Sequence, residues 1–598
     1  MKTSPGFMGR SVIVLLILAL SMIALVVQLV RVQFGPIAPV FALQSETGLG
    51  PIEKRLADRG LIFDRDGKLL ATNNSFFFLE VEIRQLTDES VKDISLVVAE
   101  LLDLKRSDIR EQLINGRESL EYYRIRLTQP ISEGGRIAIR MDKVAAGILQ
   151  QFLDDPFGPD LTGLALVPTQ ERIYPAGELT GHVLGFVNQE GKGYFGVEGF
   201  YDDWLSGKPV DIQRKFIPLE AGSQPNPTAG ANLVLTIDLD IQQTAATALR
   251  NAIERTQAES GQIIIMDPQN GEILAMVAWP ALDPTNYEEW LTGDIEAELV
   301  VSPAVAGQYE PGSTFKTLVM AAAIDEDVVS PDDEFIDEGE IEIGGHIIRN
   351  WDVEAWGLQT MQGCMQYSLN TCLAFVGYHK LGAARFYAAM EDFGIGSLTG
   401  IDMAGEVPGN MRVPGDPSWT ESDLGTNSFG QGLSLTPIQL VTAVSAIANG
   451  GVMVLPHVVR EIVSPQGEYW PNATVLGRPV SHETAQTITD MLYKAVESES
   501  SQSLVDGYPL AGKTGTAQIV TDFGYDPHWT VASFIGWGPI NDPRFVVYVR
   551  IDKPQNSPWG SVVAAPVFRE VVERLVIQLG IPPEDFYQEF AGRVEGAE

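Results

Sequence analysis

The chain has 598 residues, of which 45% are hydrophobic and 20% are charged, and its formal net charge is −38. This composition is typical of a globular protein and excludes a largely disordered one, while the length favours two or three folded units. The acidic excess argues against nucleic acid as a partner, because a phosphate backbone would be repelled.

The N-terminal segment has the composition of a membrane anchor. Residues 11–30 contain no charged side chain, and twenty helical residues span roughly the 30 Å hydrocarbon core of a bilayer. Two basic residues precede the run and one follows it, which favours a cytoplasmic N-terminus. A signal peptide cleaved near residues 40–42 is the alternative, but the run is longer than the apolar region of such peptides. We predict a cytoplasmic tail over 1–10 and a single-pass anchor over 11–31.

The part of the chain after the anchor is expected to lie outside the cytoplasm as a mixed α/β domain. Residues 59–73 predict a hairpin turning at Asp66-Gly67. Short amphipathic helices and loops are expected between about 91 and 155. The polar, proline- and glycine-bearing segment 217–232 marks a domain boundary. We therefore place the first extracytoplasmic domain at 45–215.

The second domain begins with a strand and a helix. Residues 233–239 have β character, and 244–256 place apolar side chains at helical spacing. Two β-rich runs then flank Asn270-Gly271, and a further strand pair is expected over 531–539 and 544–551.

A C-terminal helix closes this domain. Its apolar side chains share one face, and Gly580 follows the last of them. The members of that face are Phe568, Val571, Val572, Leu575 and Leu579. The fold class is therefore α+β, with an antiparallel sheet packed by helices over 232–580 and a polar tail over 581–598.

Cys364 and Cys372 are the two cysteines of the chain. They lie in a stretch that has the pattern of one helix. Eight helical residues separate Cα atoms by about 12 Å, which is too far for a disulfide. We predict two buried free thiols.

Ser313 and Lys316 form the first candidate motif. Pro311-Gly312 interrupts the chain and an apolar helix follows, so Ser313 is predicted at a helix N-terminus with Lys316 one turn later on the same face. A serine hydroxyl attacks only when a base removes its proton. Lysine can be that base if burial or a neighbouring cation lowers its pKa from about 10.4. Alone, the pair also fits an ordinary surface helix start.

Ser368 and Asn370 form the second candidate motif, predicted inside the cysteine-bearing helix. A second hydroxyl can relay a proton, and an asparagine amide can bind both a lysine and a substrate carbonyl. By itself this short pattern carries almost no information.

Residues 513–516 form the third candidate motif, in a segment with strand character. Lys513, Thr514 and Thr516 offer one cation and two hydroxyls, which suit a substrate carboxylate. Gly515 would let a ligand approach the backbone closely, and the strand edge could pair with an extended peptide. Alone, the motif is equally compatible with a structural role.

The three motifs occur in the order S-x-x-K, S-x-N and K-T-G, the signature of β-lactamases and penicillin-binding proteins. Leu369 replaces the Asp that class A β-lactamases carry in the middle motif. From about residue 50 to 580 the chain resembles the class B penicillin-binding proteins. Further family-like stretches are RGLIFDRDG from Arg59, TGHVLGFV from Thr180, GVEGFYDDWLSG from Gly196, LTID from Leu235 and SFGQGLSLTPIQL from Ser428.

The resemblance implies a pedestal of the penicillin-binding protein dimerisation type and a transpeptidase domain of the serine penicilloyl-transferase fold. Class A relatives insert a glycosyltransferase domain after the anchor. Pedestal-like motifs occupy that part of this chain, so no glycan polymerisation is expected. The implied substrates are peptidoglycan stem peptides, with a D-Ala-D-Ala donor and an amine acceptor, and β-lactams are the implied inhibitors.

The resemblance also implies a role for each site residue. Ser313 would attack the carbonyl between the two terminal D-alanines, with Lys316 as general base. Ser368, supported by Asn370, would help to move the proton to the leaving amine. Lys513 would hold the substrate carboxylate together with Thr514 and Thr516, and backbone N–H groups of Ser313 and Thr516 would form the oxyanion hole.

The sub-type expected from SFGQG and from the closing WGSVVAAPVFREVVERL is the division-type, septal enzyme. That reading implies a polytopic glycan polymerase and bitopic division proteins as partners. The alternatives are an elongation-type transpeptidase, a β-lactamase or D,D-carboxypeptidase that sends water to the acyl-enzyme, and a non-catalytic scaffold or sensor.

No cofactor or metal is expected. Residues 191–196 fit the G-x-G-x-x-G dinucleotide pattern, but no clear βαβ unit surrounds them. The acidic stretch 325–342 lacks the spacing of a calcium-binding EF-hand loop, and the six histidines include no H-E-x-x-H zinc motif.

Overall fold

The computed structural model describes residues 22, 49–55, 57–119, 123–131, 135–215, 226–287, 300–465, 467–470, 473–521 and 524–584. Apart from Met22, the predicted tail and anchor over 1–31 lie outside these residues, as does most of the C-terminal tail. The helices within the described ranges are each too short or too polar to cross a bilayer.

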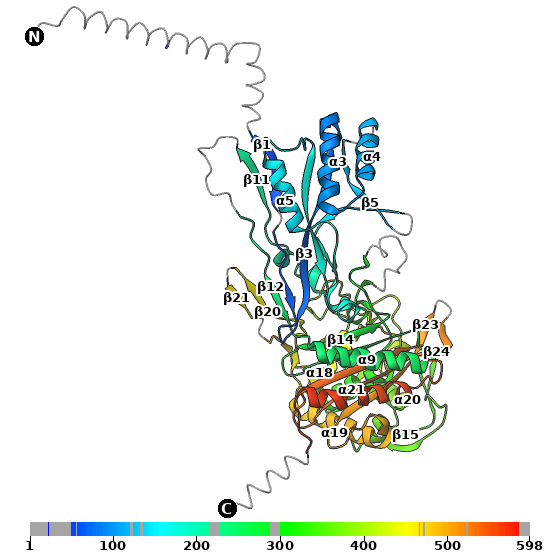
Figure 1. The fold of residues 1–598 in the computed structure, drawn as a ribbon. Helices are drawn as coiled ribbons and strands as arrows, with labels where there is room; N and C mark the ends of the chain where they lie inside the picture. The colour runs from blue at the N-terminus through cyan, green and yellow to red at the C-terminus, as the bar shows by residue number, and fades with distance from the viewer. Residues whose placement is uncertain are drawn as a thin grey trace, which may run out of the picture. The chain divides into compact units, whose positions relative to one another are not determined.

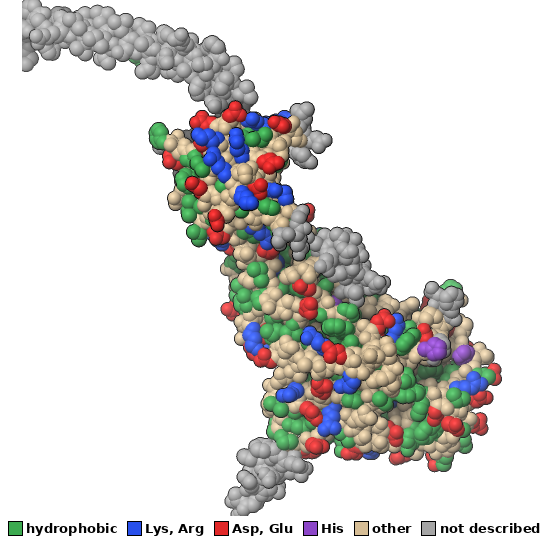
Figure 2. Space-filling model, turned by 45° about the vertical axis from the view of Figure 1, so that its right-hand side comes forward, with side chains coloured by type: hydrophobic (Ala, Val, Ile, Leu, Met, Phe, Trp, Pro, Cys, Tyr) green, Lys and Arg blue, Asp and Glu red, His purple; other side chains and the backbone are tan. Residues whose placement is uncertain are grey.

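Two compact units make up the chain, one from residues 1–58 with 207–228 and the other from 59–206 with 229–598. In the first unit, β1 (Leu49–Arg55) pairs antiparallel with β11 (Val210–Lys215). All elements named below belong to the second unit (Figure 1). On the face shown in Figure 2, acidic, basic and hydrophobic side chains are interspersed.

An eight-stranded sheet runs through the N-terminal part of the second unit. Its central strand β3 (Leu69–Glu82) pairs antiparallel with β2 (Ile62–Phe63), and the turn between them contains Gly67 at φ 85°, which confirms the predicted hairpin. The other strands are β4 (Arg124–Arg126), β7 (Arg140–Met141), β8 (Leu164–Ile173), β12 (Asn232–Leu235), β20 (Val459–Ser464) and β21 (Gly467–Tyr469).

Three amphipathic helices pack on this sheet around a core of their own, which agrees with the amphipathic helices expected between about 91 and 155. Thr87 caps α3 (Asp88–Leu102) and Asp142 caps α5 (Lys143–Asp154) through backbone N–H groups of the first turn. Between them lies α4 (Arg106–Glu118). A small hairpin joins β5 (Thr128–Pro130) to β6 (Arg136–Ala138).

Short elements connect this sheet to the C-terminal part of the unit. They are η2 (Gly177–Leu179), α6 (Gly181–Leu184), β9 (Phe186–Val187), β10 (Gly193–Tyr194), α7 (Gly196–Phe200) and α8 (Asp202–Leu205). β9 and β10 form an antiparallel hairpin, and residues 191–196 run from its turn through β10 to the start of α7, so they are not the first turn of a parallel βαβ unit as in a dinucleotide site. The Tyr201 hydroxyl donates to Asp402 Oδ2 at 2.9 Å and links the connecting elements to the C-terminal part.

A five-stranded antiparallel sheet forms the centre of the C-terminal part, in the order β14-β13-β25-β24-β23. This confirms the predicted antiparallel sheet packed by helices. The strands are β13 (Ser260–Met266), β14 (Ile273–Trp279), β23 (Ala511–Thr521), β24 (Gly524–Gly538) and β25 (Phe545–Asp552).

Helices cover both faces of this sheet. One face packs against α9 (Leu239–Thr256), α20 (Gly560–Val563) and α21 (Ala565–Gln578) (Figure 1). Four of the five apolar residues expected on α21 are buried, and Leu579 is partly buried just beyond its end. The other face packs against a larger helical region that contains α13 (Lys316–Asp325) and α18 (Pro437–Ala448).

The helical region contains helices of very different lengths, from short turns to the 18-residue α19 (His482–Glu499). Its helices are α12 (Pro303–Ala306), η4 (Gly312–Phe315), α13 (Lys316–Asp325), α14 (Met361–Gln366), α15 (Asn370–Phe375), η5 (Val376–Leu381), α16 (Gly382–Asp392), α17 (Glu421–Asn427), α18 (Pro437–Ala448), α19 (His482–Glu499) and η6 (Ser501–Ser503). Two-stranded pairs are β15 (Glu334–Asp337) with β18 (Gly357–Thr360), β16 (Glu340–Ile343) with β17 (His346–Arg349), and β19 (Met453–Val454) with β22 (Val475–Gly477).

The prediction of two free thiols is wrong. Cys364 and Cys372 form a disulfide, with their Cα atoms 6.1 Å apart. The predicted single helix is interrupted, because α14 ends at Gln366 and Ser368 adopts φ 57° before α15 begins. The left-handed residue turns the chain back, so the two cysteines lie much closer than a continuous helix would allow.

Candidate active site

Ser313 lies in η4, the 3₁₀ turn that leads directly into α13. Gly312 adopts φ 57° and its N–H donates to Gly430 O at 3.0 Å, which fixes the entry to the turn. Thr314 Oγ1 donates to Pro311 O at 2.8 Å. These contacts hold a half-buried serine hydroxyl at the start of a buried helix, as the sequence predicts.

Lys316 is the first residue of α13 and is fully buried. Its Nζ donates to Ser368 O at 2.6 Å, to Asn370 Oδ1 at 2.8 Å and to Ser368 Oγ at 3.3 Å. Burial, and then the charge of Lys513, lower the pKa of Lys316 well below its ordinary value. Both effects favour the neutral amine, and Nζ lies within hydrogen-bond reach of the Ser368 hydroxyl.

Ser368 lies in the break between α14 and α15, and Asn370 is the first residue of α15, so the prediction of one continuous helix through both is wrong. The φ of 57° at Ser368 is unusual for a residue other than glycine and is the kind of local strain that accumulates at functional sites. Asn370 is held by its N–H to Asn350 Oδ1 at 3.0 Å and by its Nδ2 to Arg349 O at 3.0 Å. These bonds leave its Oδ1 directed at Lys316.

The third motif lies on β23, the strand at one edge of the five-stranded sheet. Burial lowers the pKa of Lys513 to about 8, and its Nζ lies 3.5 Å from Thr514 Oγ1. Thr516 Oγ1 accepts a hydrogen bond from Gly560 N at 3.1 Å. The motif therefore places one buried cation and two half-buried hydroxyls along a short length of strand.

Gly515 has a packing role that the sequence did not indicate. A Cβ on Gly515 would lie 2.2 Å from Ser533 Oγ and 2.9 Å from Thr314 Cγ2. The missing side chain thus lets β23 approach the turn that carries Ser313. The absent side chain thus allows close packing within the protein, and we infer that it sets the distance between β23 and the turn that carries Ser313.

The three motifs meet at one cavity of about 320 Å³. Six of the eight predicted site residues line it, namely Ser313, Ser368, Asn370, Lys513, Thr514 and Thr516. Lys316 and Gly515 are buried against these residues. A serine, a lysine with lowered pKa and a second hydroxyl together suit acyl transfer through a covalent serine ester, and the cation with two hydroxyls suits a carboxylate on the substrate.

Sequence reasoning missed the aromatic side of the cavity, which contains Trp351, Trp356, Tyr367 and Trp559. Trp351 and Trp356 share the loop between β17 and β18, whereas Tyr367 and Trp559 come from two other segments, so no sequence pattern could have joined the four. The count of ten tryptophans was the only feature of the sequence that could have suggested an aromatic side to the cavity.

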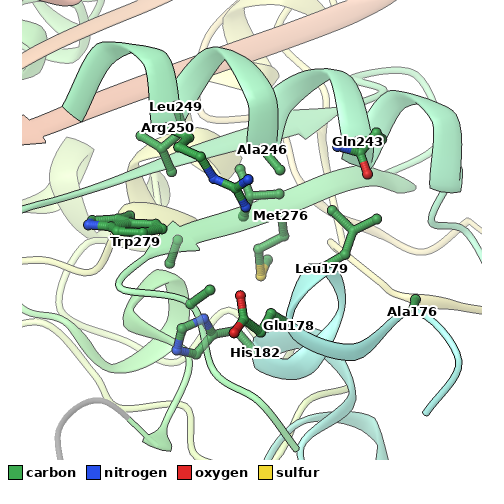
Figure 3. Close-up of a pocket in the computed structure, with 13 residues that line it drawn as sticks. Ala176, Glu178, Leu179, His182, Gln243, Ala246, Leu249, Arg250, Met276 and Trp279 are labelled. Carbon is green, nitrogen blue, oxygen red and sulfur yellow. The ribbon is translucent and has the colours of Figure 1, made fainter. Parts of the chain in front are cut away.

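A second cavity of about 310 Å³ lies between the connecting elements and the outer helix and strand of the C-terminal part (Figure 3). Glu178 and His182 lie on one side, and Arg250 of α9 with Trp279 at the end of β14 lie on the other. The Arg250 guanidinium is 6.0 Å from the centre of the Trp279 ring. Among the described residues its lining contains no serine, threonine or cysteine, so it offers no hydroxyl or thiol nucleophile and we assign the chemistry to the first cavity.

Comparisons with known proteins agree with this assignment. The family model described as the penicillin binding protein transpeptidase domain matches residues 261–573, and the penicillin-binding protein dimerisation domain matches residues 54–216. Stage V sporulation protein D of Bacillus subtilis is 33% identical over 545 residues, which cover 88% of this chain and 79% of that protein.

Two further relatives are informative. Peptidoglycan D,D-transpeptidase FtsI of Escherichia coli is 31% identical over 436 residues, covering 71% of this chain and 70% of that protein. The solved apo form of penicillin-binding protein 3 from Mycobacterium tuberculosis superposes with a TM-score of 0.65 at 25% identity, covering 89% of this chain and 98% of that chain.

Proposed function

This chain belongs to the class B penicillin-binding proteins and is a serine-type peptidoglycan D,D-transpeptidase, and from that premise we propose the roles of its site residues and its place in cell-wall synthesis. Ser313 is the nucleophile that attacks the carbonyl between the terminal D-alanines and expels the last one. Lys316 is the general base. The neutral amine takes the hydroxyl proton as the ester bond to the donor peptide forms.

Buried Lys316 between Ser368 and Asn370 is the observation that carries this proposal. Burial and the charge of Lys513 lower its pKa well below the ordinary value, which favours the neutral amine that a general base requires. Ser368 lies within hydrogen-bond reach of Nζ and can pass the proton on to the leaving amine. A lysine that only anchored the fold would have its positive charge matched by a carboxylate, and no described carboxylate pairs with Lys316.

The carboxylate of the donor peptide is assigned to Lys513, Thr514 and Thr516 on β23. At neutral pH a lysine with a pKa of about 8 is mostly charged, so it can pair with a terminal carboxylate. The backbone N–H groups of Ser313 and Thr516 are proposed to form the oxyanion hole. Such donors typically contribute about 3–4 kcal/mol to transition-state stabilisation.

We propose the division-type, septal role for this enzyme, with elongation as the alternative. The stretches SFGQG and WGSVVAAPVFREVVERL support the division type. Its partners would then be a polytopic glycan polymerase and bitopic division proteins. The uncharged run 11–30 supports a single-pass anchor in the cytoplasmic membrane, with the N-terminus inside and the catalytic domain outside.

The nucleophile is tested with the full chain in detergent and a fluorescent penicillin. The wild type should form a covalent adduct that survives denaturing electrophoresis, and Ser313→Ala should form none. A wild-type adduct that hydrolyses within seconds would support a β-lactamase. A folded wild type that forms no adduct would support the scaffold or sensor.

The sub-type is tested in the native bacterium by depletion. Filamentous cells with unfinished septa would support division, whereas rounded or swollen cells with normal septa would support elongation. A fluorescent fusion gives the second readout, because a septal enzyme should concentrate at mid-cell.

A further inference from the structure

Two tryptophans that line the catalytic cavity contact each other. Trp351 follows β17 and Trp559 immediately precedes α20. Their ring centroids are 5.3 Å apart with an interplanar angle of 72°, an edge-to-face pair. Trp351 is 51% exposed and Trp559 is 39% exposed. Two large, partly exposed side chains thus line the catalytic cavity instead of lying in the core.

Each tryptophan is tied to one of the catalytic motifs. Trp351 Nε1 donates to Tyr367 O at 3.3 Å, and that peptide immediately precedes Ser368. On the opposite wall, Gly560 N, next to Trp559, donates to Thr516 Oγ1 at 3.1 Å. The ring contact therefore joins the wall that carries Ser368 to the wall that carries β23.

A carboxylate accompanies the aromatic side chains. Trp356 stacks on Tyr367 with ring centroids 4.6 Å apart, which extends the aromatic surface of the same cavity. Glu499, at the C-terminal end of α19, is exposed and lines the cavity. Among the described residues it has no cationic partner. Aromatic faces combined with a free carboxylate suit an alkyl ammonium group, through cation–π attraction and charge pairing.

We propose that Trp351, Trp559 and Glu499 form the acceptor subsite, which receives a primary ammonium group on an aliphatic side chain of the second stem peptide. This inference rests on the proposed function, because it assumes an acyl-enzyme at Ser313. The donor carboxylate is assigned to the Lys513, Thr514 and Thr516 motif, and the hydrogen bond from Gly560 N to Thr516 Oγ1 places the adjacent Trp559 next to that motif. Departure of the terminal D-alanine leaves that side free for the incoming amine.

The reaction at this subsite is an aminolysis of the serine ester. The bound ammonium first loses one proton to solvent. The neutral nitrogen attacks the acyl carbonyl, the C–N bond forms, and the bond between the carbonyl carbon and Ser313 Oγ breaks. The second proton shed by the nitrogen passes through Lys316 to Ser313 Oγ, so the free hydroxyl and the neutral amine of Lys316 are regenerated.

The subsite would also decide between the two possible acceptors, an amine and water. Both attack the same carbonyl, and water is present in large excess. Aromatic rings beside the ester exclude water, while the bound amine gains effective concentration. The measurable property of the subsite is therefore the ratio of aminolysis to hydrolysis, not the rate of acylation.

The first test uses the full chain in detergent with an N-acyl-D-alanyl thioester as donor and Nα-acetyl-lysinamide as acceptor amine. Trp351→Ala and Trp559→Ala should lower the aminolysis-to-hydrolysis ratio by about tenfold, the scale of a desolvated cation–π contact. Aminolysis and hydrolysis start from the same acyl-enzyme, so their ratio reports on the subsite even where a substitution also changes the rate of acylation. Glu499→Gln should raise the amine concentration needed for half-maximal aminolysis, and Trp351→Phe should restore part of the ratio.

The matched control is Trp470→Ala, because Trp470 is 52% exposed and does not line the cavity. Its ratio should equal that of the wild type. An unchanged ratio in both cavity variants, with penicillin acylation retained, overturns the subsite and leaves the proposed function intact. A wild type that gives only hydrolysis at saturating amine overturns the subsite as well.

The second test needs no substitution. Nα-acetyl-Nε-trimethyl-lysinamide carries a permanent cation and has no N–H on that nitrogen, so it binds as an acceptor but cannot be acylated there. It should compete with Nα-acetyl-lysinamide in the wild type and leave thioester hydrolysis unaffected. This competition experiment uses only the wild type, so it still tests the subsite if a tryptophan variant fails to fold. Absence of competition overturns the subsite. Failure of the wild type to form any acyl-enzyme would instead overturn the proposed function.

Discussion

Buried cations occur in two regions of this molecule with opposite surroundings. Arg59 and Arg172 lie 6% and 3% exposed around Glu198, which is fully buried, with ion-pair distances of 2.6 and 2.7 Å. Asp202 adds a third pair to Arg59 at 2.7 Å. In the catalytic cavity Lys316 and Lys513 are equally buried, and no described carboxylate pairs with either.

The pKa shifts follow from this difference. Burial alone would lower the pKa of Arg59, but Glu198 and Asp202 outweigh it and the pKa is raised. Burial lowers the pKa of both lysines, and for Lys316 the charge of Lys513 adds to the effect. The comparison teaches that a buried cation with its counter-ions holds the fold together, whereas a buried cation without them is poised to lose a proton.

The largest effect is expected on the rate of acylation when Lys316, a buried cation without a counter-ion, is replaced. Lys316→Ala should lower the rate constant of penicillin acylation by about 10²–10⁴-fold, the usual contribution of a general base. The measurement is stopped-flow or quenched-flow acylation. Lys494→Ala, at an exposed lysine of α19, is the matched control and should acylate at the wild-type rate. A Lys316→Ala enzyme within tenfold of the wild type would remove lysine from the role of base.

The nucleophile and base were predictable from sequence because their geometry is local. A serine and a lysine three residues apart share a helix face, and the structure has this arrangement at η4 and α13. The conformation at Ser368 was not predictable, because a left-handed residue between two helical segments has no signal when the residue is not glycine. That single backbone angle also explains the missed disulfide.

The fold was predictable where the sequence signals were local, as in turns, or periodic, as on the apolar face of a helix. Hairpins at Gly67 and Gly271 and the apolar face of α21 are local patterns. The ion-pair cluster around Glu198 was not predicted, since its partners come from distant parts of the chain and only three-dimensional packing brings them together. The same reason hid the contact between Trp351 and Trp559.

The second prediction concerns the buried ion pairs around Glu198 instead of the two lysines that lack a counter-ion. Glu198→Gln removes the carboxylate shared by two buried arginines and should lower the free energy of unfolding by about 3–5 kcal/mol, because both cations lose their counter-ion. Urea unfolding of the full chain in detergent measures this loss. Acylation of the protein that remains folded should stay near the wild-type rate. Loss of acylation without loss of stability would contradict the purely structural role.

The third prediction is a gain in the free energy of unfolding instead of a loss. Lys513→Met removes a buried charge that lacks a counter-ion, so we expect the free energy of unfolding at pH 7 to rise by about 1–3 kcal/mol, although binding of the substrate carboxylate is lost. The pKa of Lys513 is about 8 in the folded protein, compared with 10.5 ordinarily. Between these values the unfolded chain binds more protons, so wild-type stability rises with pH.

The advantage of Lys513→Met should therefore be complete below about pH 8 and disappear as the pH approaches 10.5. Urea unfolding at pH 7 and at pH 10 measures this difference. A variant that is less stable than the wild type at pH 7 would show that the lysine contributes packing or hydrogen bonds that exceed the cost of burying its charge.

The smallest change in the free energy of unfolding is expected at an ion pair that is exposed to solvent. Arg140 Nη1 lies 2.9 Å from Glu171 Oε1, and the two side chains are 49% and 40% exposed. Glu171→Gln should lower the free energy of unfolding by no more than about 1 kcal/mol, since water solvates both charges and salt screens them. Raising the salt concentration should shrink even this loss, whereas the loss from Glu198→Gln should change little. Equal losses at the two glutamates would mean that pairing alone, and not burial, separates the structural cations from the catalytic ones.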